Sequence, residues 1–162
     1  MAEKTILQKI VERGHYKFVD SVASWQEAVK LSCESLAATG YVSENYYQQI
    51  VDCIEKYGPY VVFEHYVAMP HSQEGAEGAN KTAVGFMRVK QDVDFGKDED
   101  GEEKVARLFF TLAAKDPNEH LDNMQQLMQI FTNEPLLDAL MAANTPEDIL
   151  QAEADNPPED DL

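Results

Sequence analysis

Cysteine is scarce in this sequence, and its placement excludes the kinds of site that depend on it. The 162 residues include two cysteines, Cys33 and Cys53, which form no C-x-x-C pair. A small secreted domain held by disulfides needs a much higher density, so a reducing compartment is expected. Both thiols fall on apolar stripes of predicted helices and are interpreted as core residues.

Long apolar runs and positive charge are also in short supply. No run approaches the roughly 20 residues that a transmembrane helix needs, and the first residues lack the apolar stretch of a signal peptide. Lysine and arginine number 13 against 30 aspartate and glutamate, which gives a net charge of −17. Such repulsion disfavours nucleic acid and anionic membranes as partners. We therefore expect a cytoplasmic protein that neither binds nucleic acid nor inserts directly into a membrane.

Hydrophobic residues make up 44% of the sequence, enough for one globular core, and they recur with alternating helical and strand patterns. The last predicted strand is nearly continuous in apolar residues, which is typical of a buried position in a sheet. The patterns predict an α/β fold with a mixed sheet of about five strands, flanked by helices on both sides. Helices are predicted within 1–14, 24–40, 43–58, 117–131, 133–141 and 145–153, and strands at 16–19, 60–63, 67–69, 82–90 and 105–114.

Capping residues mark the predicted helix starts. Ser24 followed by Glu27 is a capping-box signature, and Ser43 is expected to cap the next helix. Asp116 and Pro117 stand at the N-cap and N1 positions of a later helix. The residues of that helix expected to face a core are Leu121, Met124, Met128 and Phe131.

The domain is predicted to span residues 1–153. The tail 154–162 is acidic, contains two prolines and has little to bury, so it is expected to be disordered. The acidic stretch 92–103 is interpreted as a solvated hairpin connection. It does not fit a calcium loop, because Gly96 and Arg107 would occupy the first and last ligand positions.

His71 is the first candidate for chemistry. It follows Met69-Pro70 and precedes the polar, glycine-containing stretch 72–81. Pro70 fixes its own φ and favours extended geometry at Met69, so His71 is predicted to lie exposed where a strand ends and a loop begins. An imidazole in that place can act as a nucleophile toward another protein. Most loop histidines are structurally neutral, so the assignment needs a second feature.

His120 supplies that feature, since it is predicted about one turn into the helix that follows the buried strand. Unpaired N–H groups and the positive end of the helix dipole converge there, attract anions and disfavour a protonated ring. His71 and His120 can then share one phosphoryl group. The alternative for His120 is a partly exposed helix residue with no chemical role.

A metal site is the competing use of these histidines. Zinc prefers histidine and carboxylate ligands at short spacings such as H-E-x-x-H, and no such spacing is present. No cofactor or metal is therefore expected. The residues weighed for such a site are Glu64, His65, His71, Asp116 and His120.

Four segments occur in an order and spacing that resemble the enzyme IIA components of the bacterial phosphoenolpyruvate-dependent sugar phosphotransferase system, in the mannitol, fructose and ascorbate subgroup. Within it the chain is most similar to the ascorbate type. Tyr66 and Ser72 depart from the glycines that many relatives carry there, and Glu64-His65 replaces a more typical turn. The four segments are Ser24-Trp25-Gln26-Glu27-Ala28-Val29, Tyr46-Tyr47, Tyr57-Gly58-Pro59-Tyr60 and Ala68-Met69-Pro70-His71.

The resemblance implies a phosphotransferase relay. In it, His71 accepts a phosphoryl group from the phosphohistidine of HPr and passes it to a cysteine of a IIB component, which serves a membrane IIC permease. His120 is the second active-site histidine, which hydrogen-bonds the phosphoryl group. The transported sugar is expected to be L-ascorbate. One alternative is a regulatory IIA-like phosphoprotein in which His71 phosphorylation controls partner binding, and another is a metal-dependent hydrolase.

Overall fold

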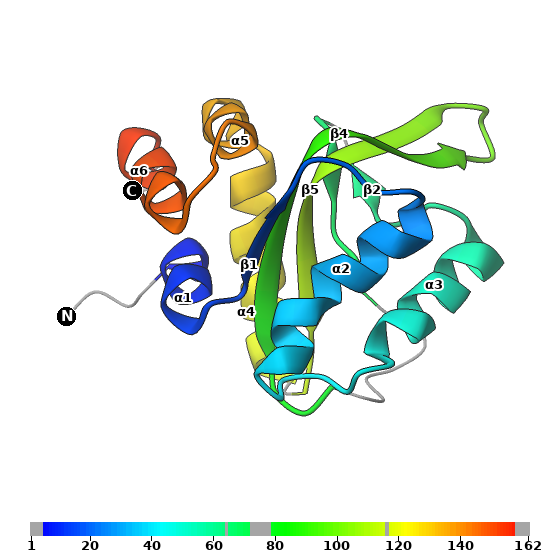
Figure 1. Cartoon of the computed structure of the whole chain (residues 1–162), viewed down its shortest axis with the longest axis horizontal. Coiled ribbons are helices and arrows are strands. Elements are labelled where there is room, and N and C mark those ends of the chain that lie inside the picture. Colours follow the sequence, from blue (N-terminus) through cyan, green and yellow to red (C-terminus); the bar gives the residue numbers. More distant parts are fainter. Residues whose placement is uncertain (1–4, 64, 72–78, 116, 158–162) are drawn as a thin grey trace.

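The computed structural model describes residues 5–63, 65–71, 79–115 and 117–157, which form helices and strands in alternation (Figure 1). The helices and strands occur in the predicted order along the chain. In chain order they are α1 (Ile6–Arg13), β1 (Tyr16–Val19), α2 (Trp25–Ala38), α3 (Tyr46–Tyr57), β2 (Val62–Phe63), β3 (Val67–Ala68), β4 (Ala83–Lys97), β5 (Glu103–Ala113), α4 (Pro117–Phe131), α5 (Glu134–Met141) and α6 (Pro146–Asp155).

The strands form one five-stranded mixed sheet, as the sequence predicted, and their order is β1-β4-β5-β3-β2. β1 pairs with β4 and β3 with β5 in parallel, whereas β4 with β5 and β2 with β3 are antiparallel. Consequently β3 and β5 end, and β1 and β4 begin, at the same end of the sheet. We call this the carboxyl end.

Helices cover both faces of the sheet, which was also predicted (Figure 1). Because side chains alternate along a strand, Met87 of β4 packs with α2 and α3, while its neighbour Phe86 packs with α1, α4, α5 and α6. Both side chains are fully buried, and burial of each stabilises the fold by about 1.5–3 kcal/mol. Cys33 and Cys53 are buried, as expected for core residues.

The structure confirms one of the two predicted serine caps and not the other. The Ser24 hydroxyl accepts a hydrogen bond from the Glu27 N–H at 3.2 Å, so this cap is confirmed. The Ser43 cap was wrong: α3 begins after Asn45, and the Ser43 hydroxyl instead donates to Asn45 Oδ1 at 2.9 Å. α4 begins at Pro117 as predicted, while Asp116 lies outside the described residues.

The hairpin prediction for 92–103 was wrong in extent. β4 continues to Lys97 and β5 begins at Glu103, so only the short turn between them is a connection. Alternate apolar residues among the acidic ones explain the difference: Val93 and Phe95 are buried, and the Phe95 ring stacks on Trp25 with centroids 5.6 Å apart. Charged neighbours on the other face concealed this alternation.

The predicted core stripe of α4 was partly wrong. Phe131 is buried and Met124 packs against the core, but Leu121 is 58% and Met128 39% exposed.

The predicted start of the disordered tail also differs from the structure. α6 continues to Asp155, into the segment predicted to be disordered from residue 154. Residues 158–162 lie outside the described part. No helix in the described ranges is long and apolar enough to cross a membrane.

His15 is buried between β1 and α2, and this makes stability depend on pH. Its Nε2 lies 3.0 Å from Thr39 Oγ1, and its ring meets the Tyr41 ring edge-on at 4.6 Å. Burial, with a smaller contribution from the charge of Arg13, lowers the pKa of His15 from 6.5 to about 4. Because the unfolded chain binds this proton more readily, stability falls as pH drops through 6.5 toward 4.

We expect His15 alone to account for a loss of about 2 kcal/mol in unfolding free energy between pH 7 and pH 5. Urea denaturation of the unmodified chain and of His15→Gln at both pH values measures this contribution. The variant is expected to lose less stability on acidification. Equal losses in the two chains would contradict the assignment.

Candidate functional site

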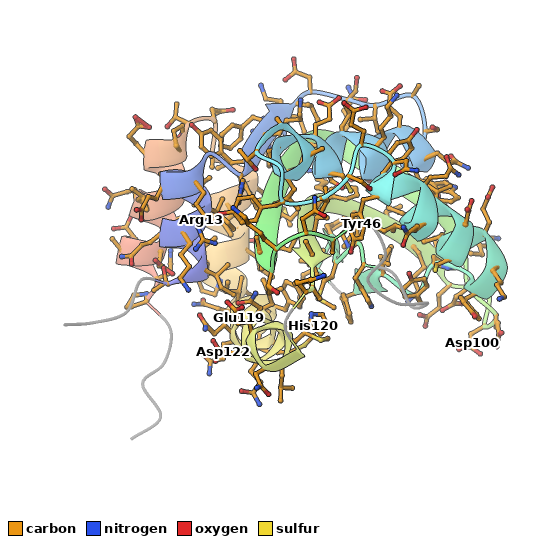
Figure 2. The ribbon with its side chains drawn as sticks, turned by 90° about the horizontal axis from the view of Figure 1, so that it is seen from below. Arg13, Tyr46, Asp100, Glu119, His120 and Asp122 are labelled. Carbon is orange, nitrogen blue, oxygen red and sulfur yellow. The ribbon has the colours of Figure 1, made fainter. Side chains whose placement is uncertain are left out.

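His71 and His120 come together at the carboxyl end of the sheet. His71 directly follows the extension of β3, and His120 lies in the first turn of α4, which follows β5. Since β3 and β5 are parallel neighbours, both histidines must lie at this end. Burial lowers the pKa of His71 and the charge of His120 adds to this shift, so the two imidazoles interact electrostatically. Figure 2 views the molecule from this end and labels His120 and Glu119 at α4.

The backbone around His71 is fixed by hydrogen bonds to neighbouring strands. The Met69 N–H donates to the Val61 carbonyl at 2.8 Å, and the Pro70 carbonyl accepts from the Leu112 N–H at 2.9 Å. These bonds continue the sheet pairing past β3. The imidazole therefore projects from a backbone held on both sides.

The tautomer of His71 follows from one hydrogen bond. Its Nδ1 lies 2.6 Å from the Met69 carbonyl oxygen. A carbonyl only accepts, so Nδ1 carries the proton, and in the neutral ring Nε2 keeps a free lone pair. Nε2 is thus the nucleophilic atom of this site.

Burial is the main cause of a lowered pKa at His71. The Met69 hydrogen bond opposes the shift, and the charge of His120 adds to it. His71 is half-buried and not exposed as the sequence predicted, because its ring packs beside an aromatic side chain. The neutral, nucleophilic form is favoured near neutral pH.

That aromatic side chain is Tyr60, whose role the sequence interpretation missed. The Tyr60 hydroxyl donates a hydrogen bond to the His71 carbonyl oxygen, and the two rings are perpendicular with centroids 5.2 Å apart. The available signal was its position just before β2, which pairs with β3. Tyr60 is thus placed to hold both the backbone and the ring of His71.

His120 is also half-buried, and its Nδ1 is enclosed without a hydrogen-bond partner in the described part of the chain. Buried polar atoms are normally satisfied, so this nitrogen is available for a hydrogen bond to a group outside the described residues. The N-terminal turn of α4 adds backbone N–H groups that have no acceptor within the helix, and a positive dipole end. This combination suits an oxyanion.

His65 was also weighed for chemistry but does not lie at this end of the sheet. His65 lies in the turn between β2 and β3, at the opposite end of β3, with its Nε2 3.5 Å from Glu134 Oε2. Both His65 and Tyr66 have positive φ, so the regular strand that would give His65 the same face as His71 is broken there. No group of three His, Cys, Asp or Glu side chains that could hold a metal ion occurs in the ranges that the structure describes. Glu64, Ser72 and Asp116 lie outside these ranges.

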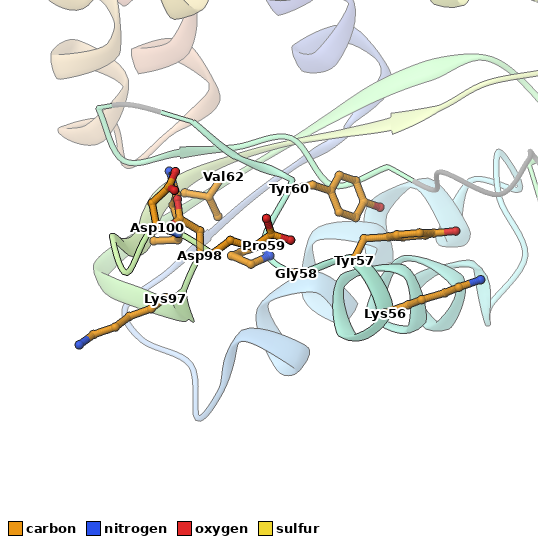
Figure 3. Close-up of a pocket in the computed structure, with 11 residues that line it drawn as sticks. Lys56, Tyr57, Gly58, Pro59, Tyr60, Val62, Lys97, Asp98 and Asp100 are labelled. Atoms are coloured by element: carbon orange, nitrogen blue, oxygen red, sulfur yellow. The ribbon is translucent and has the colours of Figure 1, made fainter.

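A broad hollow lies between the end of α3 and the β4–β5 turn, and Tyr60 is one of the residues that line it (Figure 3). It is lined by charges of both signs, and Lys104 Nζ lies 3.5 Å from Asp98 Oδ2 within it. These ions neutralise one another. Cys33 contributes no nucleophile, because burial raises the pKa of its thiol to about 12, which a hydrogen bond from Ser32 offsets in part.

Comparison with known proteins identifies relatives that cover nearly the whole chain. Residues 9–153 match the family described as phosphoenolpyruvate-dependent sugar phosphotransferase system, EIIA 2. The chain is 34% identical over 142 residues to an ascorbate-specific PTS system EIIA component of Escherichia coli K12, covering 87% of this chain and 90% of that protein.

Solved structures agree with the sequence match. The mannitol-specific cryptic phosphotransferase enzyme IIA CmtB from Escherichia coli superposes with a TM-score of 0.78 at 29% identity, over 91% of this chain and 97% of that one. The IIA protein in a complex of mannitol enzyme IIA with phosphorylated enzyme IIB from Escherichia coli gives a TM-score of 0.71 at 26% identity, over 87% and 94%.

Proposed function

Since the chain belongs to the EIIA 2 family of the phosphoenolpyruvate-dependent sugar phosphotransferase system, we propose that it accepts a phosphoryl group on His71 from phosphorylated HPr and passes it to a cysteine of a IIB component. The IIB component would serve a membrane IIC permease. Similarity to ascorbate-specific relatives favours L-ascorbate as the sugar. The proposal places the protein in the cytoplasm, where these carriers meet.

One observation carries this proposal: the Met69 carbonyl accepts a hydrogen bond from the Nδ1–H of His71, which leaves the Nε2 lone pair free. In the first transfer, Nε2 attacks phosphorus in line while the bond to the donor imidazole breaks, and the donor keeps that electron pair. In the second, the IIB sulfur attacks and the Nε2–P bond breaks. Both steps depend on positioning and charge stabilisation more than on proton transfer.

His120 is proposed to bind the phosphoryl oxygens. Its enclosed Nδ1 lacks a partner among the described residues, and a phosphoryl oxygen would supply one if that nitrogen carries a proton. The N-terminal turn of α4 supplies further N–H donors. Hydrogen bonds to a charged group of this kind contribute about 1.5–3 kcal/mol each, which offsets repulsion from the acidic chain.

The test uses the purified chain with phosphoenolpyruvate, enzyme I and HPr, followed by addition of IIB proteins. Mass spectrometry is expected to show one added phosphoryl group, which disappears when the cognate IIB component is added. Phosphorylation without transfer to any IIB would favour the regulatory alternative. Absence of phosphorylation would contradict both.

Tyr60 provides a prediction about positioning. Tyr60→Phe keeps the ring but removes the hydrogen bond to the His71 carbonyl. Because such a bond contributes about 0.5–1.5 kcal/mol, we expect phosphoryl acceptance to slow roughly threefold to tenfold. Tyr60→Leu also removes the ring that helps to bury His71, so the pKa of His71 is expected to rise.

Mass spectrometry of samples quenched at successive times measures the rate of phosphoryl acceptance, and NMR titration of the His71 imidazole measures its pKa. Tyr57→Phe is the matched control, since Tyr57 is a neighbouring tyrosine that is 51% exposed. If Tyr60→Phe accepts phosphate at the same rate as Tyr57→Phe, Tyr60 has no positioning role.

A further inference from the structure

At the carboxyl end of the sheet, positively charged side chains lie together without a counter-ion in the described part of the chain. Arg13 at the end of α1 and Lys81 just before β4 both lie over the Tyr41 ring, with Arg13 Cζ 5.8 Å and Lys81 Nζ 5.0 Å from its centroid. Both side chains are exposed. Lys9 lies one helical turn before Arg13 and lines the same small hollow.

Among the described residues these cations have no acidic partners, in contrast to others in the protein. Elsewhere, Lys17 lies 2.6 Å from Glu34 and Arg107 lies 2.6 Å from Asp92. In the part of the chain that the structure describes, neither Arg13 nor Lys81 forms an ion pair. Like charges held at one ring without a counter-ion repel one another, although the chain has 30 acidic residues that could neutralise them. An anionic partner would relieve that repulsion.

The groups around the cluster leave its charge positive. His15, edge-on to Tyr41, has a pKa lowered to about 4 by burial and is neutral near pH 7. Glu119 lines the hollow with Lys9 and Arg13 but forms no ion pair with either in the described structure. The Tyr41 ring adds attraction for cations and holds Arg13 and Lys81 in place.

The cluster lies at the same end of the molecule as the phosphoryl site. Figure 2 shows Arg13 and His120 on the face viewed from below, with Glu119 between them. Lys81 precedes β4, whose first residue pairs with the last residue of β5, from which the chain continues to α4 and His120. A protein docked over His71 and His120 would therefore reach Arg13 and Lys81.

We propose that Arg13, Tyr41 and Lys81 form a docking site for an acidic segment of the protein that exchanges a phosphoryl group with His71. This rests on the proposed function. Arg13 and Lys81 come from separate segments of the chain, and Lys9 lies beyond them. Positive charges at several places suit a partner segment that carries several carboxylates. Charge complementarity of this kind raises association rates and fixes orientation in transient complexes.

The first arm of the test needs no phosphoryl transfer. A deca-glutamate peptide is titrated into the isotope-labelled chain at low salt, and amide shifts are followed by NMR. Saturable shifts are expected at residues 13, 41 and 81, and their loss is expected in the double variant Arg13→Glu/Lys81→Glu. Lys30→Glu/Lys97→Glu is the matched control, because it makes the same change in net charge and Lys30 also lies over a tyrosine ring, 5.6 Å from the Tyr47 centroid.

The second arm measures kcat/KM for exchange with HPr and with the IIB component at several salt concentrations. The double variant is expected to lose at least tenfold with one of them at low salt and to show a weaker salt dependence, while the control pair keeps both. The proposal is overturned if peptide shifts persist in the double variant, or if both partners exchange with it at the control rate. If the proposed function itself is wrong, the unmodified chain will take up no phosphoryl group in the second arm. The peptide titration of the first arm still tests the docking site in that case.

Discussion

His71→Ala is expected to abolish phosphoryl acceptance from HPr. The substitution removes the Nε2 lone pair that attacks phosphorus, and no other described nucleophile lies in its place. Loss of a covalent nucleophile reduces rates by a factor on the order of 10⁴ or more, which is below detection in a mass-spectrometric assay. His71 is only half-buried, so the fold should survive.

The matched control is His65→Ala. His65 is also close to β3 in sequence but lies in the turn at its opposite end, beside Glu134. This variant is expected to be phosphorylated at the normal rate, and circular dichroism should show both variants folded. Undiminished phosphorylation of His71→Ala would remove His71 from the mechanism.

His120→Ala is expected to accept phosphate but to transfer it poorly. Removing one preorganised donor to a developing negative charge costs about 2.7–4 kcal/mol, or roughly 10²- to 10³-fold in rate. Acceptance should fall less, since the nucleophile and its anchor at Met69 are intact. His120→Gln keeps an N–H donor and should recover part of the lost rate.

The pKa of His71 separates this role from a loss of structure. His120 lowers that pKa through its positive charge, so His120→Ala should raise it. NMR titration of the His71 imidazole measures the change, and single-turnover transfer to IIB measures the rate. A variant that transfers at the full rate, with an unchanged pKa for His71, would show that His120 is only a helix residue.

The sequence could predict the strands, the helices and the places of the two histidines at their ends because these depend on local patterns. Pro70 marks the end of a strand, and Pro117 marks the start of a helix after a buried strand. Parallel pairing of β3 and β5 then brings His71 and His120 to one end. The pairing itself was not readable from the sequence, which is why their proximity was a hypothesis until the fold was seen.

What the sequence could not predict depends on contacts between distant segments. Tyr60 looked like one of several tyrosines near a turn, and only the pairing of β2 with β3 places its hydroxyl on the His71 carbonyl. Leu121 and Met128 fit an apolar stripe, but α4 rests on the sheet along another side and leaves them exposed. Periodicity shows that a helix has an apolar face, but it does not show which side of the helix contacts the core.

The proposed relay depends most directly on which nitrogen of which histidine carries the phosphoryl group. Nitrogen-15 and phosphorus-31 NMR of the phosphorylated chain, with labelled histidine, measures this. The predicted result is phosphorus bonded to Nε2 of His71, with Nδ1 still protonated against the Met69 carbonyl. Phosphorus on Nδ1 of His71, or on any other residue, would contradict the account.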